Sequence, residues 1–394
     1  MAEPGKVVRP QSASAGVASP PVDSANDSTQ QSRIRTASTL QGSVQVLILY
    51  DVSEEIRLQE LREILGARPV VPSFKSAAPG YVRFARPPVA EPVDPIQLDG
   101  GLRLEGQIKY YDYGVVSVLF EMPFSGEWQE LVKLASGWMW DANFEKYATE
   151  IARKKLERAG PALVKPYKEW LNEDYFMFHI RDINGQPSAD ELLSLQGQQI
   201  AQIVRGETGL LSENETKEVL QSSISYYPND LAVIGWNGAF IYDTAAGAQT
   251  ALELLEYANS QLLEFRHYDE LLTRELAGVY RLLDRGRGMR MRWRLAREAT
   301  RLNTVLLDVT ELSERADNAI KFLSDMFSAR MYRLAASKVG VLDYKNLVGQ
   351  KLRTADELYR FMVQEFHQGR AFALELMVVI ILIIEIVFLF KGKP

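Results

Sequence analysis

The last part of the chain is an apolar block that constrains the fold more than any other feature. Between residues 371 and 390 only Glu375 and Glu385 are charged, and Lys391 follows directly. A helix rises about 1.5 Å per residue, so a helix of this length would span about 30 Å, the hydrocarbon thickness of a bilayer. We therefore predict a single C-terminal transmembrane helix over 371–390, which would hold the chain to a membrane by its tail.

Two carboxylates inside the block keep other interpretations open. An acidic residue at the centre of a span costs on the order of 3 kcal/mol on insertion scales, and each aliphatic residue returns a few tenths of that. Glu375 lies near the N-terminal edge of the block, and Glu385 lies a few residues before the terminal lysines. Glu385 is either a polar contact inside a helix bundle or a protonated carboxyl near the interface. The alternative for the whole block is a buried core helix or an oligomer-forming helix.

The N-terminal residues 1–42 are rich in Ser, Ala, Pro, Gln and Thr and have few large apolar side chains. Such a segment cannot bury enough surface to offset the entropy lost on ordering, so we predict a disordered tail. It contains no apolar stretch typical of a signal peptide. We therefore expect the bulk of the protein to stay on the side of synthesis, cytoplasmic or, in a mitochondrion, facing the matrix.

Composition excludes several classes of site. The chain has 394 residues, no cysteine and three histidines, at positions 179, 267 and 367. The absence of cysteine excludes disulfides, thiolate catalysis and cysteine-ligated metals. We predict that His179, His267 and His367 are ordinary surface or edge residues, and we predict no metal site or cofactor.

Residues 43–243 show a mixed pattern of short strands and helices. Val44–Tyr50 is a β-rich apolar run, and Leu231–Tyr242 reads as two strands joined by Asn237-Gly238, a favoured hairpin pair. Two further strands are expected around Tyr111–Gly114. These patterns predict an α+β domain with a largely antiparallel sheet.

Helices are expected between these strands. Ser53 resembles an N-cap of a helix that Gly66 would stop, and Ser125 resembles the start of a helix carrying Trp128. A charged helix is expected over 143–159.

From residue 244 to 370 the pattern changes to long helices. Apolar residues recur at alternating three- and four-residue spacing, first over 255–283 and then from Leu302 to Met326. This spacing predicts a long-helix hairpin or coiled coil, with breaks at Gly286, Gly288 and Gly340. A third helix should begin near Tyr344 and continue into the apolar block.

Eight arginines lie between Arg281 and Arg301, opposed only by Asp284 and Glu298. If the second and third helices pair antiparallel from Gly340, the membrane would lie level with about Leu312, and the arginines would lie near its surface. We therefore predict contact with anionic lipid or nucleic acid; the candidate residues are Arg285, Arg287, Arg290, Arg292, Trp293, Arg294 and Arg297. The alternative is a solvated or acid-paired basic helix.

No local catalytic motif is present: the sequence contains no phosphate-binding glycine loop, no zinc-protease motif and no nucleophile elbow. We therefore predict no catalytic residue, although carboxylates distant in sequence could still meet in the α+β domain.

The end of the chain resembles a known family. Leu-Glu at 374–375, an aliphatic run and Glu-Ile-Val at 385–387 resemble the closing signature of the DUF155 family of RMND1-like membrane proteins. The segments 351–352 and 356–358 resemble that family's final amphipathic helix, and 113–116 resembles its Gly-Val-Val strand. The resemblance implies a membrane-anchored, oligomeric protein without known catalytic chemistry, with eukaryotic relatives at the inner mitochondrial membrane and in organelle translation.

Together these features predict a non-enzymatic, tail-anchored scaffold or tether. We expect it to form a homo-oligomer, to contact membrane lipids and to hold an unidentified protein partner. The alternatives are a membrane-tethered enzyme with a non-local carboxylate site in the α+β domain, and an RNA- or ribosome-tethering factor that uses the Arg281–Arg301 segment.

Overall fold

The computed structural model describes residues 39–66, 82–84, 86–98, 101–284, 289–318, 320–322 and 326–392. The chain divides between Ser38 and Thr39, and all described residues belong to the second unit, Thr39–Pro394. The predicted disordered tail lies outside the described residues as far as residue 38. The first strand begins at Leu40, within the predicted tail.

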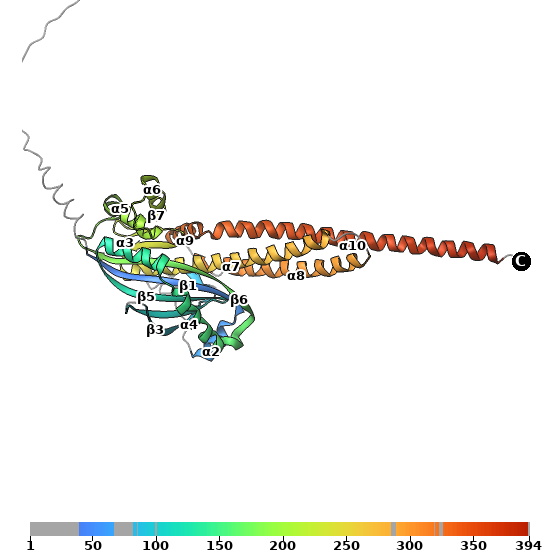
Figure 1. Cartoon of the computed structure of the whole chain (residues 1–394), viewed down its shortest axis with the longest axis horizontal. Helices are drawn as coiled ribbons and strands as arrows, with labels where there is room; N and C mark the ends of the chain where they lie inside the picture. The colour runs from blue at the N-terminus through green and yellow to red at the C-terminus, as the bar shows by residue number, and fades with distance from the viewer. Residues whose placement is uncertain are drawn as a thin grey trace, which may run out of the picture. The chain divides into compact units, whose positions relative to one another are not determined.

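The second unit is built on an 8-stranded sheet in the order β3-β4-β5-β1-β6-β9-β8-β7 (Figure 1). The strands are β1 (Leu40–Ile56), β3 (Val89–Gln97), β4 (Arg103–Tyr110), β5 (Val115–Gly126), β6 (Leu163–Ile183), β7 (Ser223–Ile224), β8 (Leu231–Ile234) and β9 (Gly238–Tyr242). β6 and β9 pair parallel, and the other neighbours pair antiparallel. The predicted α+β class with a largely antiparallel sheet is confirmed.

β1 is central because its apolar run serves both faces of the sheet. Val46 and Ile48 belong to the core on one face, and Leu47 and Leu49 belong to the core on the other. Successive side chains of a strand point to opposite faces, so a continuous apolar run is typical of a strand covered on both sides. β1 accordingly pairs with both β5 and β6.

Helices on one face of the sheet pack against the Val46 side. They are α2 (Leu58–Leu65), α3 (Trp128–Ser136), α4 (Phe144–Ala159), α5 (Ala189–Arg205) and α6 (Glu213–Leu220), with short turns at Gly137–Asp141 and Gly160–Ala162. The expected helix over 143–159 is confirmed, with Asn143 as its N-cap.

Two predicted helix starts are wrong. Ser53 is buried inside β1, where its hydroxyl donates to the carbonyl of Glu55, and the helix begins at Leu58. Ser125 is still part of β5; α3 is capped by Glu127, which exchanges hydrogen bonds with Glu130. In both cases strand pairing with a neighbour outlasts the local capping preference.

Helices on the other face are longer, except α9. They are α7 (Ala245–Asp284), α8 (Met289–Asn318), α9 (Met326–Val339) and α10 (Val341–Lys391). A small sheet of β2 (Val82–Phe84) and β10 (Ile320–Phe322) accompanies them. The predicted break at Gly340 is confirmed, because Gly340 adopts φ +95 between α9 and α10. The breaks predicted at Gly286 and Gly288 lie outside the described residues.

The predicted second helix is interrupted. The apolar stripe from Leu302 to Met326 was expected on one helix, yet α8 ends at Asn318, β10 follows, and Met326 begins α9. An apolar stripe reports only which residues face a core, so it does not distinguish one helix from two that share that core.

α7, α8 and α10 form a three-helix stalk. Leu276 and Val279 of α7, Ala299 and Leu302 of α8, and Ala355 and Met362 of α10 are its buried core. The Nζ of Lys351 on α10 lies 2.6 Å from both Oδ1 of Asp269 and Oγ1 of Thr273 on α7. Together with the shared core, this register shows that α7 and α10 run parallel, and α8 runs antiparallel to both.

Candidate functional site

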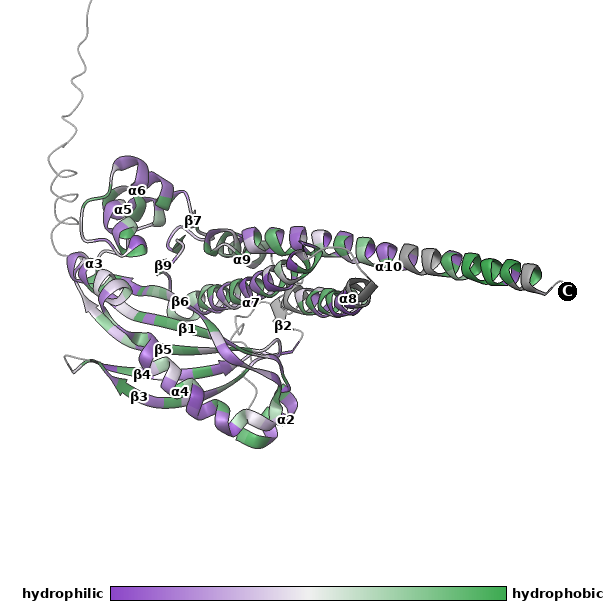
Figure 2. Cartoon of the chain, turned by 45° about the vertical axis from the view of Figure 1, so that its right-hand side comes forward, coloured by the Kyte–Doolittle hydropathy of each residue, from purple (hydrophilic) through white to green (hydrophobic). Residues whose placement is uncertain are grey.

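The far end of α10 carries the longest run of exposed apolar side chains among the described residues. From Leu374 to Val387 every described side chain is exposed, with Leu374 at 59%, Met377 at 56% and Ile383 at 54%. Figure 2 shows this end as a continuous hydrophobic segment. A helix that is apolar on every side is normally covered by protein or lipid.

The predicted transmembrane helix is not supported by the described residues. Within them, no helix combines the length and the hydropathy needed to cross a membrane. The side chains of residues 371–373, 388 and 390, which belong to the predicted span, lie outside the described part of the chain. Glu375 and Glu385 are both exposed on α10.

The described part of the arginine segment lies at the end of α7 and the start of α8, at the end of the stalk away from the sheet. Arg285 and Arg287 lie outside the described residues, and so do the side chains of Arg290, Arg292 and Trp293. Arg294 and Arg297 are exposed on α8. Arg281, in the last turn of α7, is exposed as well, although it was not among the candidate contact residues.

The expected level of the bilayer along the second helix is wrong. Leu312 packs in the core beneath the sheet with Val309 and Leu272, rather than near the apolar end of α10. β10 and α9 lie between α8 and Gly340 in the chain, so α8 does not pair with α10 directly from Gly340 as a simple hairpin would.

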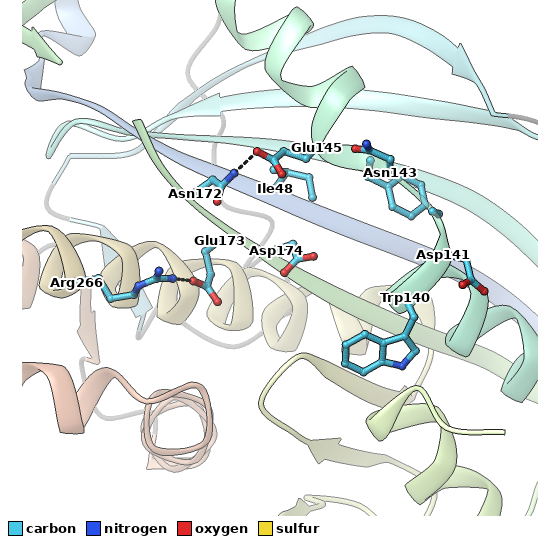
Figure 3. Close-up of a pocket in the computed structure, with 11 residues that line it drawn as sticks. Ile48, Trp140, Asp141, Asn143, Glu145, Asn172, Glu173, Asp174 and Arg266 are labelled. Carbon is cyan, nitrogen blue, oxygen red and sulfur yellow. Dashed lines mark hydrogen bonds and ion pairs between the residues drawn. The ribbon is translucent and has the colours of Figure 1, made fainter. Parts of the chain in front are cut away.

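A polar cleft of about 510 Å³ opens in the α+β head. Figure 3 shows its walls, which come from the turn before α4, from β6 and from α7. The polar and aromatic lining residues are Trp140, Asp141, Asn143, Phe144, Glu145, Asn172, Glu173, Asp174 and Arg266. None of these residues was predicted as a site residue, because the contributing segments are far apart in the chain. A non-local carboxylate site in the α+β domain was expected only as an alternative, without named residues.

The cleft exists because β6 lacks a neighbouring strand at this point. β9 begins opposite Phe176, so the preceding residues of β6 form an open edge on that side. The open edge of β6 ends at Phe176, whose N–H donates to the Asn237 carbonyl. Side chains from both faces of the sheet can therefore reach the same cleft.

Carboxylates dominate the electrostatics of the cleft. Burial raises the pKa of Glu173, and its ion pair with Arg266 opposes that rise. Desolvation by the surrounding walls also raises the pKa of Asp174, although its side chain remains exposed. Glu145 accepts a hydrogen bond from Asn172 at 2.5 Å. Such an arrangement can bind cations or exchange protons nearer neutral pH than free carboxylates can. No described group of three or more acidic or histidine side chains is placed to hold a metal ion.

Two further polar groups lie between α7 and the sheet, one around Glu256 and one around His267. Lys109 and Ser117 both donate to the carboxylate of Glu256, and all three side chains are largely withdrawn from solvent. The Nδ1 of His267 lies 2.6 Å from Oδ2 of the buried Asp51. The Tyr167 ring stacks on the His267 ring, with 4.6 Å between the ring centres. Burial is the main cause that raises the pKa of Asp51.

The predicted surface position of the histidines is therefore wrong for two of them. His179 is 4% exposed on β6, and the side chain of His267 is only 15% exposed where it pairs with Asp51. His367 is exposed on α10, as predicted. Polar residues of α7 such as Glu256 and Asn259 are buried because that helix is enclosed on every side near the sheet, which a single apolar stripe does not reveal.

Comparison with known proteins gives a different relationship from the one inferred from the tail. The model of the family described as "Uncharacterized protein MJ0711, N-terminal domain" matches residues 41–249, which hold the sheet and the start of α7. Uncharacterized protein MJ0711 of Methanocaldococcus jannaschii is 20% identical over 188 residues, which are 48% of this chain and 58% of that protein. No solved structure matches the chain.

The resemblance to the DUF155 family is wrong. It rested mainly on an aliphatic run with two glutamates, and on the short segments 351–352, 356–358 and 113–116. Such a run recurs in unrelated apolar helices because few residue types can form it. The family match instead covers residues 41–249, a far longer part of the chain that includes the head domain. The chain belongs to the family defined by the N-terminal domain of uncharacterized protein MJ0711.

Proposed function

We propose that this protein is a membrane-attached scaffold or tether, held to the lipid by the end of α10, with its α+β head presented at the membrane surface. One observation carries the proposal: α10 continues past the core of the stalk and exposes apolar side chains on every side from Leu374 to Val387. Water would solvate this surface at a considerable free-energy cost, which insertion into lipid removes.

The sequence around this surface supports insertion. Residues 371–373 and 388–390 are also uncharged, and α10 is helical through Lys391. Leucine, isoleucine, valine and phenylalanine each favour insertion by about 0.3 to 0.6 kcal/mol. Glu375 lies near one end of the segment, where headgroups can solvate it, so Glu385 is the main opposing charge.

The stalk would transmit the position of the anchor to the head. α10 is one helix of 51 residues, and its first half packs against α7 and α8. The head would therefore be held at a defined distance from the lipid, as a scaffold that presents a partner-binding surface requires. We place the head on the side of synthesis.

Membrane extraction tests the proposal. We expect the full-length protein to remain in membranes after carbonate extraction and a truncation at Arg370 to be released. The double substitution Ile380→Arg with Ile383→Arg should also release it, because each charge near the centre of the segment costs about 2.5 to 3.5 kcal/mol. Leu347→Arg is the matched control, since Leu347 is an exposed apolar residue of α10 within the stalk.

The control should stay in the membrane fraction. Release of the full-length protein as a soluble oligomer would contradict membrane attachment and make the end of α10 an assembly helix. If the full-length protein is retained, crosslinking in the membrane fraction tests whether it is the homo-oligomer that we expect.

A further inference from the structure

We infer that the tip of the α7–α8 hairpin docks on anionic lipid headgroups through Arg281, Arg294 and Arg297, and so makes membrane attachment selective for a negatively charged leaflet. This inference rests on the proposed membrane attachment by α10. It uses only arginines whose side chains the structure describes.

The register of the stalk places these arginines at its membrane end. Lys351 bonds to both Asp269 and Thr273, so α10 residues lie opposite α7 residues about 80 positions earlier in the chain. Arg281 therefore lies opposite about residue 361 of α10. On α8, Arg301 pairs with Glu275 at 2.7 Å, so Arg294 and Arg297, closer to the turn, lie at about the same level as Arg281.

The distance from this level to the lipid is short. The apolar sequence of α10 begins at residue 371, about ten residues and about 15 Å further along the helix. A headgroup layer occupies about 5 to 7 Å of that distance. The remaining gap is comparable to the Debye length of about 8 to 10 Å, and the long arginine side chains and any tilt of the stalk reduce it further.

The three arginines are available for such a contact. All three side chains are exposed. None of them forms an ion pair with another described residue. Arg301, one turn further from the tip, is instead held by Glu275. The chain as a whole has a net charge of -6, so a positive tip beside the apolar end would also orient the molecule as it approaches an anionic surface.

Lipid is favoured over nucleic acid because of continuity with the anchor. The arginines belong to the same end of the stalk as the exposed apolar residues, so any membrane that receives α10 faces the tip. Each basic residue near an anionic leaflet contributes about 1 kcal/mol, which is about a fivefold gain in affinity.

The test uses the full chain and vesicles of two compositions, phosphatidylcholine alone and phosphatidylcholine with about 30% phosphatidylserine. We expect the wild type to bind both and to prefer the anionic vesicles at least about tenfold, with a preference that falls as salt rises. Arg281→Gln, Arg294→Gln and Arg297→Gln together should remove most of that preference and leave binding to neutral vesicles unchanged.

The matched control replaces three exposed lysines of the head, Lys133, Lys154 and Lys217, by Gln. It removes the same charge from the chain and should keep the anionic preference. Unchanged anionic preference in the arginine variant would overturn the inference. So would a result in which that variant loses binding to a single-stranded RNA and behaves like wild type on vesicles. Failure of the wild type to bind either vesicle would instead contradict the attachment by α10.

Discussion

At the scale of single residues, buried polar side chains make the stability of the head depend on pH. His179 lies on β6, and its Nε2 is 2.9 Å from the carbonyl oxygen of Asp243. Burial lowers the pKa of His179 and the nearby Arg181 lowers it further, although the hydrogen bond to the carbonyl opposes both. The folded protein therefore holds this imidazole neutral to a lower pH than the unfolded chain does.

This shift predicts a loss of stability in mild acid. Below about pH 6.5 the unfolded chain takes up a proton that folded His179 does not, so the free energy of unfolding falls as the pH drops through the range between the two pKa values. His179→Gln should flatten this dependence, measured by urea unfolding at about pH 7.5 and about pH 5.5. His367→Gln is the control, because it removes an exposed histidine of α10 in place of the buried one.

Backbone geometry decides the connections at the scale of helices and strands. Gly340 separates α9 from α10 with φ +95, a left-handed conformation that side chains with a Cβ rarely adopt. Its Cβ position would lie 3.5 Å from the Trp236 ring, an ordinary contact. Any penalty for a side chain at this position therefore comes from the backbone and not from crowding.

We predict that Gly340→Ala destabilises the protein by about 1 to 2 kcal/mol. Gly349→Ala is the matched control: Gly349 lies within α10, and a Cβ there would meet nothing within 4 Å. That substitution should raise stability by about 0.5 to 1 kcal/mol, because alanine favours a helix more than glycine does. Equal effects of the two substitutions in thermal unfolding would contradict the role given to Gly340.

At the scale of the whole molecule, the protein combines a head and a stalk that have partly separate cores. The sheet is covered by one core on each face, whereas the far part of the stalk has a small core of its own that includes Met362. Regions with few buried apolar contacts open at lower free energy than the core of a domain. The far part of the stalk should therefore loosen before the sheet does.

Truncation of the stalk core tests this separation. Met362→Ala should cost about 2 to 5 kcal/mol locally, because Met362 is fully buried. Hydrogen exchange should quicken in α8 and the facing part of α10, while amides of β1 keep their protection. Phe361→Ala, at the exposed neighbouring position, should leave exchange unchanged. Faster exchange in β1 as well would mean that head and stalk unfold as one unit.

Local sequence patterns were reliable where the structure depends on neighbouring residues. The β8–β9 hairpin, the strands flanking Tyr111–Gly114 and the helix after Asn143 were all predicted, and the structure contains them. The predicted turn pair Asn237-Gly238 is wrong, because Gly238 is the first residue of β9 and accepts a hydrogen bond from the Gly235 N–H. They were less reliable where pairing across the sheet competes, as at Ser53, or where one apolar stripe serves two helices, as between α8 and α9. The family was misjudged from the tail because a run of aliphatic residues contains little specific information.

The sequence by itself determined the α+β class of the head, the long helices after residue 244 and the apolar character of the C-terminal segment, because periodicity and capping act over a few residues. Only the tertiary structure decided that α7 and α10 run parallel, that His267 meets Asp51, and that Glu145, Asp174 and Arg266 line one cleft. These groups come from segments far apart in the chain, and what brings them together is the packing of helices on the two faces of the sheet. The level of the arginine tip beside α10 depends on that same packing.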